Sequence, residues 1–410
     1  MSQDFLSHTL GNGMKLVAEK MPGVRSAAMS LLTPAGASTD PVDGLGTANV
    51  LSELVLRGAG ERDSRQLTDH LDRLGLQRSG SASVLHTRFG ASAMAANVMA
   101  GLDVYADILR RARLPEDGFA PAIDLTLQGL DGIDDDPRQK LSIKLRECHW
   151  PWPLGRNTLG DPAHVEKLPL DDLRTAYRTR YRPEQTILAV AGDVDFGFLK
   201  DKAESLFGDW TAAPAAPVPA RDTRKRLHFE EQKSEQTHIG LAYDAIDETH
   251  ADYYAVRLAT EVLSGGMSGR LFTEIREKKA LVYSVNAGYS SLPGRGAIMG
   301  YAGTSNERAQ QTLDAFLVEL HRLSDGITDQ ELKRAKTGLK SSTIMSGEST
   351  GSRSGAIAHD CFVRGRLRTM DEIIAAIDAV TVDRVNDYLA ANRPKDFTIV
   401  IVGPKELNLP

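Results

Sequence analysis

Stretches with the apolar spacing of strands and of helices follow one another along this chain. Strands are predicted at Met14–Met21 and Ser26–Gly36, where β-prone residues run between glycine-containing turns. Helical spacing covers Arg65–Leu74 and Glu307–Leu323, and a hairpin is predicted around "LPGRG" (Leu292–Gly296). Hairpins occur here in place of regular βαβ alternation. The pattern therefore predicts α+β domains in which antiparallel-rich sheets are backed by helices.

The two halves of the chain repeat one plan. "DLRTAYRTRYRPEQTILAVAGDV" (Asp172–Val194) aligns without a gap with "DRVNDYLAANRPKDFTIVIVGPK" (Asp383–Lys405). Each stretch has an amphipathic helix, an Arg-Pro break and a β-rich run that ends at glycine. Four pairs share this spacing: Asp172 and Asp383, Tyr177 and Tyr388, Pro183 and Pro394, and Gly192 and Gly403. "RLHFEEQ" and Gln236–Ile246 repeat the two opening strands, so we expect two homologous domains.

A stretch with neither strand nor helix spacing, Asp209–Arg226, separates the halves. We expect an N-terminal domain at 1–208, a linker at 209–226 and a C-terminal domain at 227–410. The basic run Arg221–Arg226 lies beside the Pro/Ala-rich part, and we interpret it as solvated linker.

Composition narrows the function classes. The 410 residues carry a formal charge of −6, which gives no reason to expect a nucleic-acid partner. The two cysteines, Cys148 and Cys361, form no CxxC motif, and the ten histidines form no HxxH or HxH motif. The run Asp134–Asp136 lacks the spacing of a calcium loop. With neither an apolar signal core nor a membrane-length apolar run, we expect a cytoplasmic protein.

One predicted helix has the spacing of a metal site without the residues for it. In "GTANVLSELVLRG" (Gly46–Gly58), Asn49, Ser52 and Glu53 fall at i, i+3 and i+4. At this spacing two histidines reach one zinc ion, with a glutamate beside them as general base. None of these three residues is the type that this chemistry needs. From the residues alone, the stretch is equally typical of a solvated helix stripe.

Longer stretches carry a family resemblance. "LSGGMSGRLFTEIREKKALVYSVNAGYSS" (Leu263–Ser291), followed by "GYAGT", resembles the second-half signature of the M16 (pitrilysin-like) metallopeptidases. "RYRPEQTILAVAGDV" resembles the strand that ends the family's N-terminal domain, and "GTANVLSELVLRG" resembles its zinc-binding helix. The family includes mitochondrial processing peptidase and the core proteins of respiratory complex III. The resemblance covers essentially the whole chain and implies the M16, LuxS-like fold.

Mapped through this resemblance, the HxxEH zinc motif is lost. Asn49 stands for the first histidine, Ser52 for the glutamate base and Glu53 for the second histidine. The third ligand, a later glutamate, maps to Gly129, or to Leu130 if the gap shifts by one. The resemblance thus implies a chain without zinc and without peptidase activity of its own.

A second element of the family is retained. The family has an Arg and a Tyr seven residues apart that reach the zinc site of the opposing N-terminal half, and here they are Arg276 and Tyr283. Guanidinium and phenol groups can donate hydrogen bonds to a peptide carbonyl and to the oxyanion formed from it. On spacing alone, Arg276 is equally an ordinary residue of a helix end and Tyr283 a half-buried strand residue.

Two further stretches bear on the comparison with relatives. "SGGMSGR" (Ser264–Arg270) lacks the pattern of a phosphate-binding loop and is shorter than the glycine-rich insertion of the non-catalytic processing-peptidase subunit. This short form favours a bacterial type. In the family, peptides add to a sheet edge in the part that corresponds to Gln77–Met94.

Together these features predict the zinc-free subunit of a heterodimeric M16 peptidase. Its partner would carry HxxEH and the zinc ion, and Arg276 and Tyr283 would bind peptide or unfolded polypeptide at that zinc. The alternative is a non-enzymatic scaffold or peptide-binding homodimer that resembles the complex III core proteins. A third interpretation is a factor that presents one precursor peptide to a partner enzyme.

Overall fold

The structure is a computed structural model that describes residues 3–212 and 218–409. It divides into two compact units, and each unit contains one segment from the other half of the chain. Unit 1 is Met1–Gly132, Arg156–Arg221 and Ser346–Thr369, and unit 2 is Ile133–Gly155, Asp222–Met345 and Met370–Pro410. The change from unit 1 to unit 2 after Arg221 lies within the predicted linker. Residues 213–217 of that linker lie outside the described residues.

Unit 1 is built on a six-stranded sheet with the strand order β1-β2-β8-β3-β7-β6. Strand β2 runs parallel to β8, and all other neighbours are antiparallel. The strands are β1 (Asp4–Thr9), β2 (Lys15–Lys20), β3 (Ser26–Thr33), β6 (Gln77–Ala82), β7 (Thr87–Met94) and β8 (Ile187–Gly192). A small hairpin, β4 (Gly58–Ala59) and β5 (Arg62–Asp63), lies outside this sheet.

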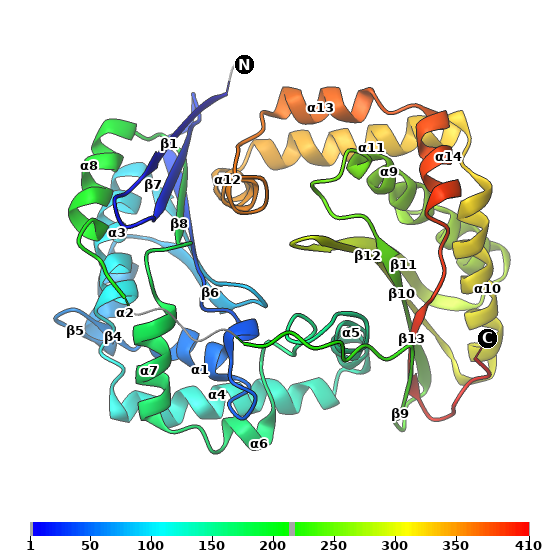
Figure 1. The fold of residues 1–410 in the computed structure, drawn as a ribbon, viewed down its shortest axis with the longest axis horizontal. Coiled ribbons are helices and arrows are strands. Elements are labelled where there is room, and N and C mark those ends of the chain that lie inside the picture. Colours follow the sequence, from blue (N-terminus) through cyan, green and yellow to red (C-terminus); the bar gives the residue numbers. More distant parts are fainter. Residues whose placement is uncertain (1–2, 213–217, 410) are drawn as a thin grey trace. The chain divides into compact units, whose positions relative to one another are not determined.

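Helices cover both faces of the unit 1 sheet (Figure 1). Helices α3 and α8 pack on one face, where Phe89 of β7 meets Tyr105 of α3. Helix α12, from the second half of the chain, packs through Ile357, Ala358 and Cys361 on the other face. The helices of this unit are α1 (Thr47–Leu54), α2 (Ser64–Arg73), α3 (Ala95–Arg110), α4 (Glu116–Asp134), α6 (Pro162–Val165), α7 (Leu170–Arg180), α8 (Phe196–Phe207) and α12 (Thr350–Arg364), with a 3₁₀ turn η1 (Ala37–Thr39).

A buried ion pair fixes α12 to this sheet. The Arg353 Nε of α12 donates to the Glu19 Oε2 of β2 over 2.7 Å, and both side chains are 4% exposed. The pair joins residues 334 positions apart in sequence. It specifies where the incoming helix sits, because each charge would be costly to bury alone.

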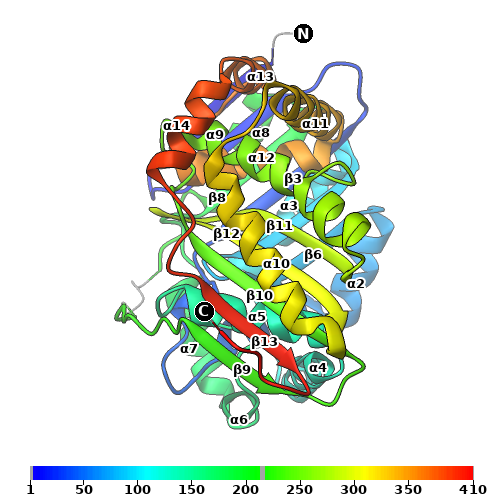
Figure 2. The same ribbon diagram turned by 90° about the vertical axis from the view of Figure 1, so that its right-hand side faces the viewer.

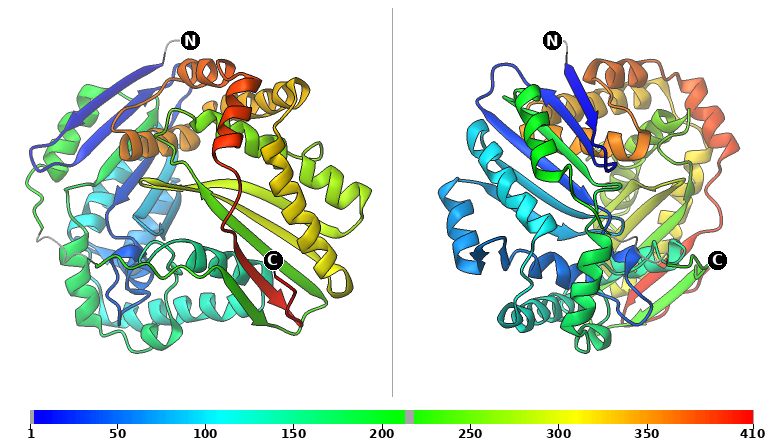
Figure 3. Two further views of the ribbon diagram at one scale, coloured as in Figure 1. Left: turned by 45° about the vertical axis from the view of Figure 1, so that its right-hand side comes forward. Right: turned by 60° about the vertical axis from the view of Figure 1, so that its left-hand side comes forward.

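Unit 2 has a five-stranded sheet in the order β11-β12-β10-β13-β9 (Figure 2). Strand β13 pairs parallel with β9, and the remaining pairs are antiparallel. The strands are β9 (Leu227–Glu231), β10 (Gln236–Ala245), β11 (Val282–Leu292), β12 (Arg295–Ser305) and β13 (Thr398–Gly403). The β11–β12 hairpin, yellow-green in Figure 3, forms one edge of the sheet and confirms the hairpin predicted around Leu292–Gly296.

The main core of unit 2 lies between this sheet and helices α9, α10 and α14. On the opposite face, Leu141, Leu145 and Cys148 of α5 pack on β10 and β13. Helix α5 comes from the first half of the chain. The helices are α5 (Pro137–His149), α9 (Tyr253–Ser264), α10 (Ala309–Arg322), α11 (Asp329–Gly347), α13 (Met370–Asp378) and α14 (Val382–Ala391), with 3₁₀ turns η3 (Asn306–Arg308) and η4 (Leu323–Asp325) and a π-helix η2 (Phe272–Lys278).

The internal repeat is visible in both sheets. Strands β2, β8, β3, β7 and β6 of unit 1 have the same order and relative directions as β9, β13, β10, β12 and β11 of unit 2. Strand β8 is matched by β13 at the spacing seen in the sequence. Gln185 and Asp396, equivalent positions before these strands, both have positive φ, at 69° and 52°. The α+β prediction, with two antiparallel-rich sheets backed by helices, is confirmed.

The same repeat relates α5 and α12, the helices that pack on the sheet formed by the other half of the chain. Helices α4 and α5 occupy the positions in the first half that α11 and α12 occupy in the second. In each pair the second helix packs on the sheet formed by the other half of the chain. A face of each sheet is therefore completed by a segment distant in sequence.

Candidate functional site

The helix that has the spacing of a metal site is α1. A buried carboxylate binds the backbone at its start. Asp40 accepts hydrogen bonds from the backbone N–H groups of Gly46 (3.0 Å) and Ala48 (2.9 Å). Arg180 of α7 neutralises Asp40 across a 2.6 Å contact. Gly46 has φ +107°, which favours glycine at this position. Val50, Leu51 and Leu54 form the buried stripe of α1.

Two polar side chains of α1 make local hydrogen bonds, one to α4 and one to the backbone of α1. Asn49 donates through Nδ2 to Thr126 Oγ1 over 3.0 Å, and Thr126 donates to the backbone carbonyl of Ala122. Ser52 is 1% exposed and donates to the carbonyl of Asn49 over 2.8 Å. Glu53 is half-buried. The three predicted positions are thus adjacent, and two of them are engaged in local hydrogen bonds.

Gly129 lies on α4, one turn after Thr126, and is therefore on the helix side that meets α1. It has no side chain to offer, and a Cβ there would lie 3.6 Å from Leu159. Leu130, the alternative position, is buried. Neither residue supplies a metal ligand.

This donor set does not fit zinc. Zinc sites in proteins use thiolate, imidazole and carboxylate ligands, and Glu53 alone is of these types. An amide that donates to Thr126 and a hydroxyl that donates to a backbone carbonyl replace the other ligand and the base. In the described part of the chain, no three His, Cys, Asp or Glu side chains gather in a geometry that would hold a metal ion.

Arg276 lies in the π-helix η2 of unit 2, and its side chain is exposed. The guanidinium carbon lies 5.0 Å from the centre of the Phe272 ring, so a cation–π contact supports it from one side. No carboxylate among residues 3–212 and 218–409 lies within ion-pair distance of it. The nearby acid, Glu274, is engaged by Lys278 (2.9 Å) and by Arg322 (3.7 Å). Their contacts lower the pKa of Glu274, with the Lys278 hydrogen bond as the largest cause.

The turn between Arg276 and Tyr283 is fixed by several contacts. Ala280 has φ +50°, in the left-handed region that non-glycine residues rarely adopt. Arg308 donates to its carbonyl over 2.6 Å. The next residue, Leu281, is buried, donates to the carbonyl of Ile275 and accepts from the Thr304 hydroxyl at 2.5 Å.

Tyr283 is the extra residue of a β-bulge. Val282 pairs with Thr304 and Ser284 pairs with Gly303, which leaves Tyr283 without a partner on β12. The side chain is 62% exposed, and within the described residues its hydroxyl has no hydrogen-bond partner. Bulges of this kind turn a side chain away from the regular sheet direction and are over-represented beside active sites, as π-helices are. Both predicted residues are therefore exposed on irregular backbone that its surroundings hold in place.

The two candidate elements lie in different units. Asn49, Ser52, Glu53 and Gly129 belong to unit 1, whereas Arg276 and Tyr283 belong to unit 2. Three contributing residues were not predicted from the sequence. Thr126 had a signal, because it lies one turn before Gly129. Asp40 and Arg308 had none, because their roles depend on partners distant in sequence.

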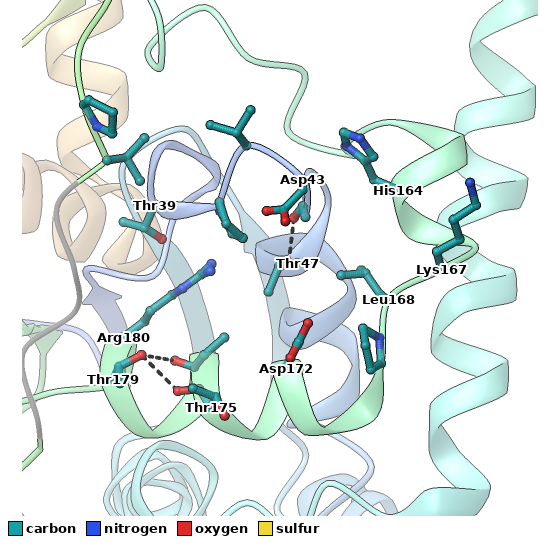
Figure 4. Close-up of a pocket in the computed structure, with 17 residues that line it drawn as sticks. Thr39, Asp43, Thr47, His164, Lys167, Leu168, Asp172, Thr175, Thr179 and Arg180 are labelled. Atoms are coloured by element: carbon teal, nitrogen blue, oxygen red, sulfur yellow. Dashed lines mark hydrogen bonds between the residues drawn. The ribbon is translucent and has the colours of Figure 1, made fainter.

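Unit 1 has two other features that bear on function, a pocket and an exposed sheet edge. A pocket of about 730 Å³ lies between the start of α1 and helix α7, and Figure 4 shows Thr39, Asp43 and Arg180 among its lining side chains. It includes Thr47 of α1 but none of the predicted site positions. Strand β6, in the stretch where the resemblance places peptide binding, forms the sheet edge next to β7.

Comparison with known proteins covers both halves of the chain. Residues 15–161 match the family model described as insulinase (peptidase family M16), and residues 167–339 match the model described as peptidase M16 inactive domain. An uncharacterized zinc protease of Bacillus subtilis, YmxG, is 28% identical over 404 residues, covering 97% of this chain and 98% of that protein. An uncharacterized zinc protease of Mycobacterium tuberculosis is 26% identical, covering 97% of this chain and 92% of that protein.

Solved structures share the fold over nearly the full length. A peptidase M16 inactive domain from Pseudomonas fluorescens superposes with a TM-score of 0.87 at 23% identity, covering 99% of this chain and all of that chain. A protease from Helicobacter pylori gives 0.88 at 20% identity, covering 98% of this chain and 100% of that chain. No helix in the described ranges is both long and apolar enough to cross a membrane. The two matching family models together span most of the sequence, and the chain belongs to the M16 peptidase family.

Proposed function

We propose that this chain is the zinc-free subunit of a two-chain M16 peptidase and that it supplies Arg276 and Tyr283 to a partner's zinc site. The observation that carries the proposal is the contrast between two elements. On α1 the positions of the first ligand and of the general base hold Asn49 and Ser52, whose side chains are engaged in local hydrogen bonds. On η2 and β11 two strong donors remain exposed on backbone that is fixed by its neighbours.

The chemistry of the pair suits a supporting role in peptide hydrolysis. Both side chains donate hydrogen bonds, and neither is a metal ligand or a general base at neutral pH. In the proposed complex, Tyr283 and Arg276 would donate to the carbonyl oxygen of the scissile peptide. The same donors would stabilise the negative charge that develops on this oxygen when hydroxide from the partner's zinc attacks the carbon. Such donors are most effective when they are held in position before the reaction. In this chain the turn at Ala280 fixes the backbone between them.

The test uses an HxxEH-containing M16 chain from the same organism, purified together with this chain. Turnover of a fluorogenic peptide is measured for the wild-type pair, for Tyr283→Phe and for Arg276→Ala. Removing one oxyanion donor is expected to lower kcat by about 100-fold, while the affinity between the two chains stays unchanged.

Matched controls lie in the same segment. Tyr289, also on β11, donates its hydroxyl to the backbone of Ile246 within unit 2, so Tyr289→Phe is expected to leave turnover unchanged. Lys279→Ala removes an exposed cation three residues after Arg276 and serves as the charge control. Equal turnover in Tyr283→Phe, Arg276→Ala and the wild-type pair would remove the proposed role.

The homodimer alternative makes the opposite prediction for composition. A scaffold or peptide-binding homodimer would form a stable assembly of this chain alone and would bind no HxxEH chain. Analytical ultracentrifugation of the chain with and without that partner distinguishes the two. Both the heterodimer and the homodimer interpretation require that α1 holds no zinc. Tightly bound, stoichiometric zinc in the isolated chain would therefore contradict both.

A further inference from the structure

A second cleft in unit 1 is lined by polar residues, and most of its side chains are charged. It has a volume of about 690 Å³ and lies where the β4–β5 hairpin meets α2 and the end of α3. Arg62 of β5, His70 and Arg73 of α2, and Arg111 after α3 line it, together with Glu61 and Asp107. Gly60 and Gln66 complete the lining, so no large apolar side chain borders this cleft. Its size fits a small molecule, and its lining excludes an apolar one.

Positive charge exceeds negative charge in this cleft, because three guanidinium groups face two carboxylates. Asp107, whose side chain is 9% exposed, is shared by two of them: Arg62 donates over 3.2 Å and Arg111 Nε over 2.9 Å. Arg73 donates to a neutral group, the backbone carbonyl of Asp69, over 3.1 Å. Each guanidinium has five N–H groups, and these contacts use only a few of them.

The backbone around the cleft holds these arginines on fixed supports. Gly60 has φ +57°, and a Cβ at this position would lie 2.5 Å from Asp107 Oδ2, so the hairpin closes directly on that carboxylate. Gly60 also donates its N–H to the carbonyl of Arg111 over 2.9 Å. Helix α2 begins with a complete capping box between Asp63 and Gln66. These contacts fix the backbone that carries the arginines before a ligand arrives.

His70 reports the electrostatic environment of the cleft. Its pKa lies below the usual value, first because of partial burial and then because of the positive charges of Arg62 and Arg73, against which Asp103 acts weakly. A bound anion would offset these cations and favour the charged imidazolium. The histidine is thus a built-in probe of occupancy.

We propose that this cleft binds a small oxyanion with at least two negative charges, of the phosphate-ester or polyphosphate class. Arg73 and Arg111 would donate to different oxygens of the ligand, while Asp107 keeps Arg62 in place. The planar guanidinium fork matches phosphate geometry, and such charge-assisted hydrogen bonds are strong. This binding is independent of the proposed peptidase role.

The test is titration of the full chain with pyrophosphate by calorimetry at constant ionic strength. Loss of a charged hydrogen-bonding partner is expected to weaken binding at least about tenfold in Arg73→Gln and in Arg111→Gln. The matched control is Arg65→Gln, which removes the same charge from α2 at a side chain that is 91% exposed and outside the cleft. Its affinity should equal that of the wild type.

One further measurement separates specific binding from general charge attraction. The pKa of His70, followed by NMR, should rise when pyrophosphate is added to the wild type and stay constant in Arg73→Gln. The proposal is overturned if Arg65→Gln weakens binding as much as Arg73→Gln, or if the wild type neither binds pyrophosphate nor shifts His70.

Discussion

Arg180→Gln is expected to destabilise unit 1 by about 3 kcal/mol at neutral pH and by less in mild acid. Arg180 and Asp40 are 7% and 2% exposed, and their charged atoms lie 2.6 Å apart. Removing one partner of a buried ion pair costs about 3–5 kcal/mol, because the remaining charge is left in a poorly solvating environment. The backbone N–H groups of Gly46 and Ala48 still bind the carboxylate, which places the expected loss at the lower end.

The pH dependence follows from the pKa of Asp40. Burial raises this pKa above the ordinary value of 3.8, and Arg180 acts in the opposite direction. Without Arg180 the pKa of the folded state rises further. A carboxyl whose folded pKa is higher than its unfolded pKa destabilises the protein above both values, and this penalty is relieved as pH falls through the folded pKa. The difference from wild type should therefore be smaller at pH 5 than at pH 7.5.

Urea unfolding at pH 7.5 and pH 5 measures this difference, with tryptophan fluorescence and far-ultraviolet circular dichroism as probes. Trp210, buried in unit 1 against Phe207, reports on this unit. The control is Arg178→Gln on the same helix, where an exposed arginine donates to the Thr175 hydroxyl and a loss below about 0.5 kcal/mol is expected. A loss below about 1 kcal/mol for Arg180→Gln at pH 7.5, or one that does not shrink at pH 5, would show that the buried pair with Asp40 does not stabilise unit 1 in this way.

Two further predictions concern unit 2. Gly240→Val should lower the free energy of unfolding in urea by about 1–3 kcal/mol, because even a Cβ at Gly240 would lie 3.2 Å from Leu141 of α5. The control is Gly288→Val, where a Cβ would have no atom within 4 Å. Equal losses of stability in the two variants would contradict this prediction. Glu331→Gln should lower the free energy of unfolding by about 2–3 kcal/mol at pH 7. The pKa of Glu331 is lowered from 4.5 to about 2, and the hydrogen bond from Arg270 is the largest cause. A carboxyl whose pKa is lowered in the folded state stabilises the protein above pH 4.5, and this stabilisation is lost as the pH falls toward 2. The difference in unfolding free energy between variant and wild type should therefore narrow over that range. A constant difference would show that the ion pair with Arg270 is not its cause.

Local sequence patterns predicted several of the elements and the repeat. The spacing that joins Asp172–Val194 to Asp383–Lys405 is reproduced by α7 and β8 in one unit and by α14 and β13 in the other. Even the positive φ of Gln185 recurs at Asp396, since the same turn precedes each strand. These features are predictable because helix and strand periodicity, Arg-Pro breaks and terminal glycines act over a few neighbouring residues.

The candidate site was only partly accessible from sequence. The positions Asn49, Ser52, Arg276 and Tyr283 follow from spacing and family resemblance. The hydrogen bond from Asn49 to Thr126 and the bulge at Tyr283 do not, because each depends on which segment packs against which. The resemblance indicated a lost zinc motif, and the structure adds what the substituted side chains contact instead.

The sequence alone establishes the family, the repeated α+β plan and the absence of histidine and cysteine from α1. The tertiary structure was needed to show that α5 packs on the second sheet and α12 on the first, where Arg353 meets Glu19 inside unit 1. It also decided that Asp107 gathers two arginines into a cleft. The physical reason is that an apolar helix face fits either of two similar sheets locally. Buried charges have low energy only beside their partners, and those partners are set by the fold.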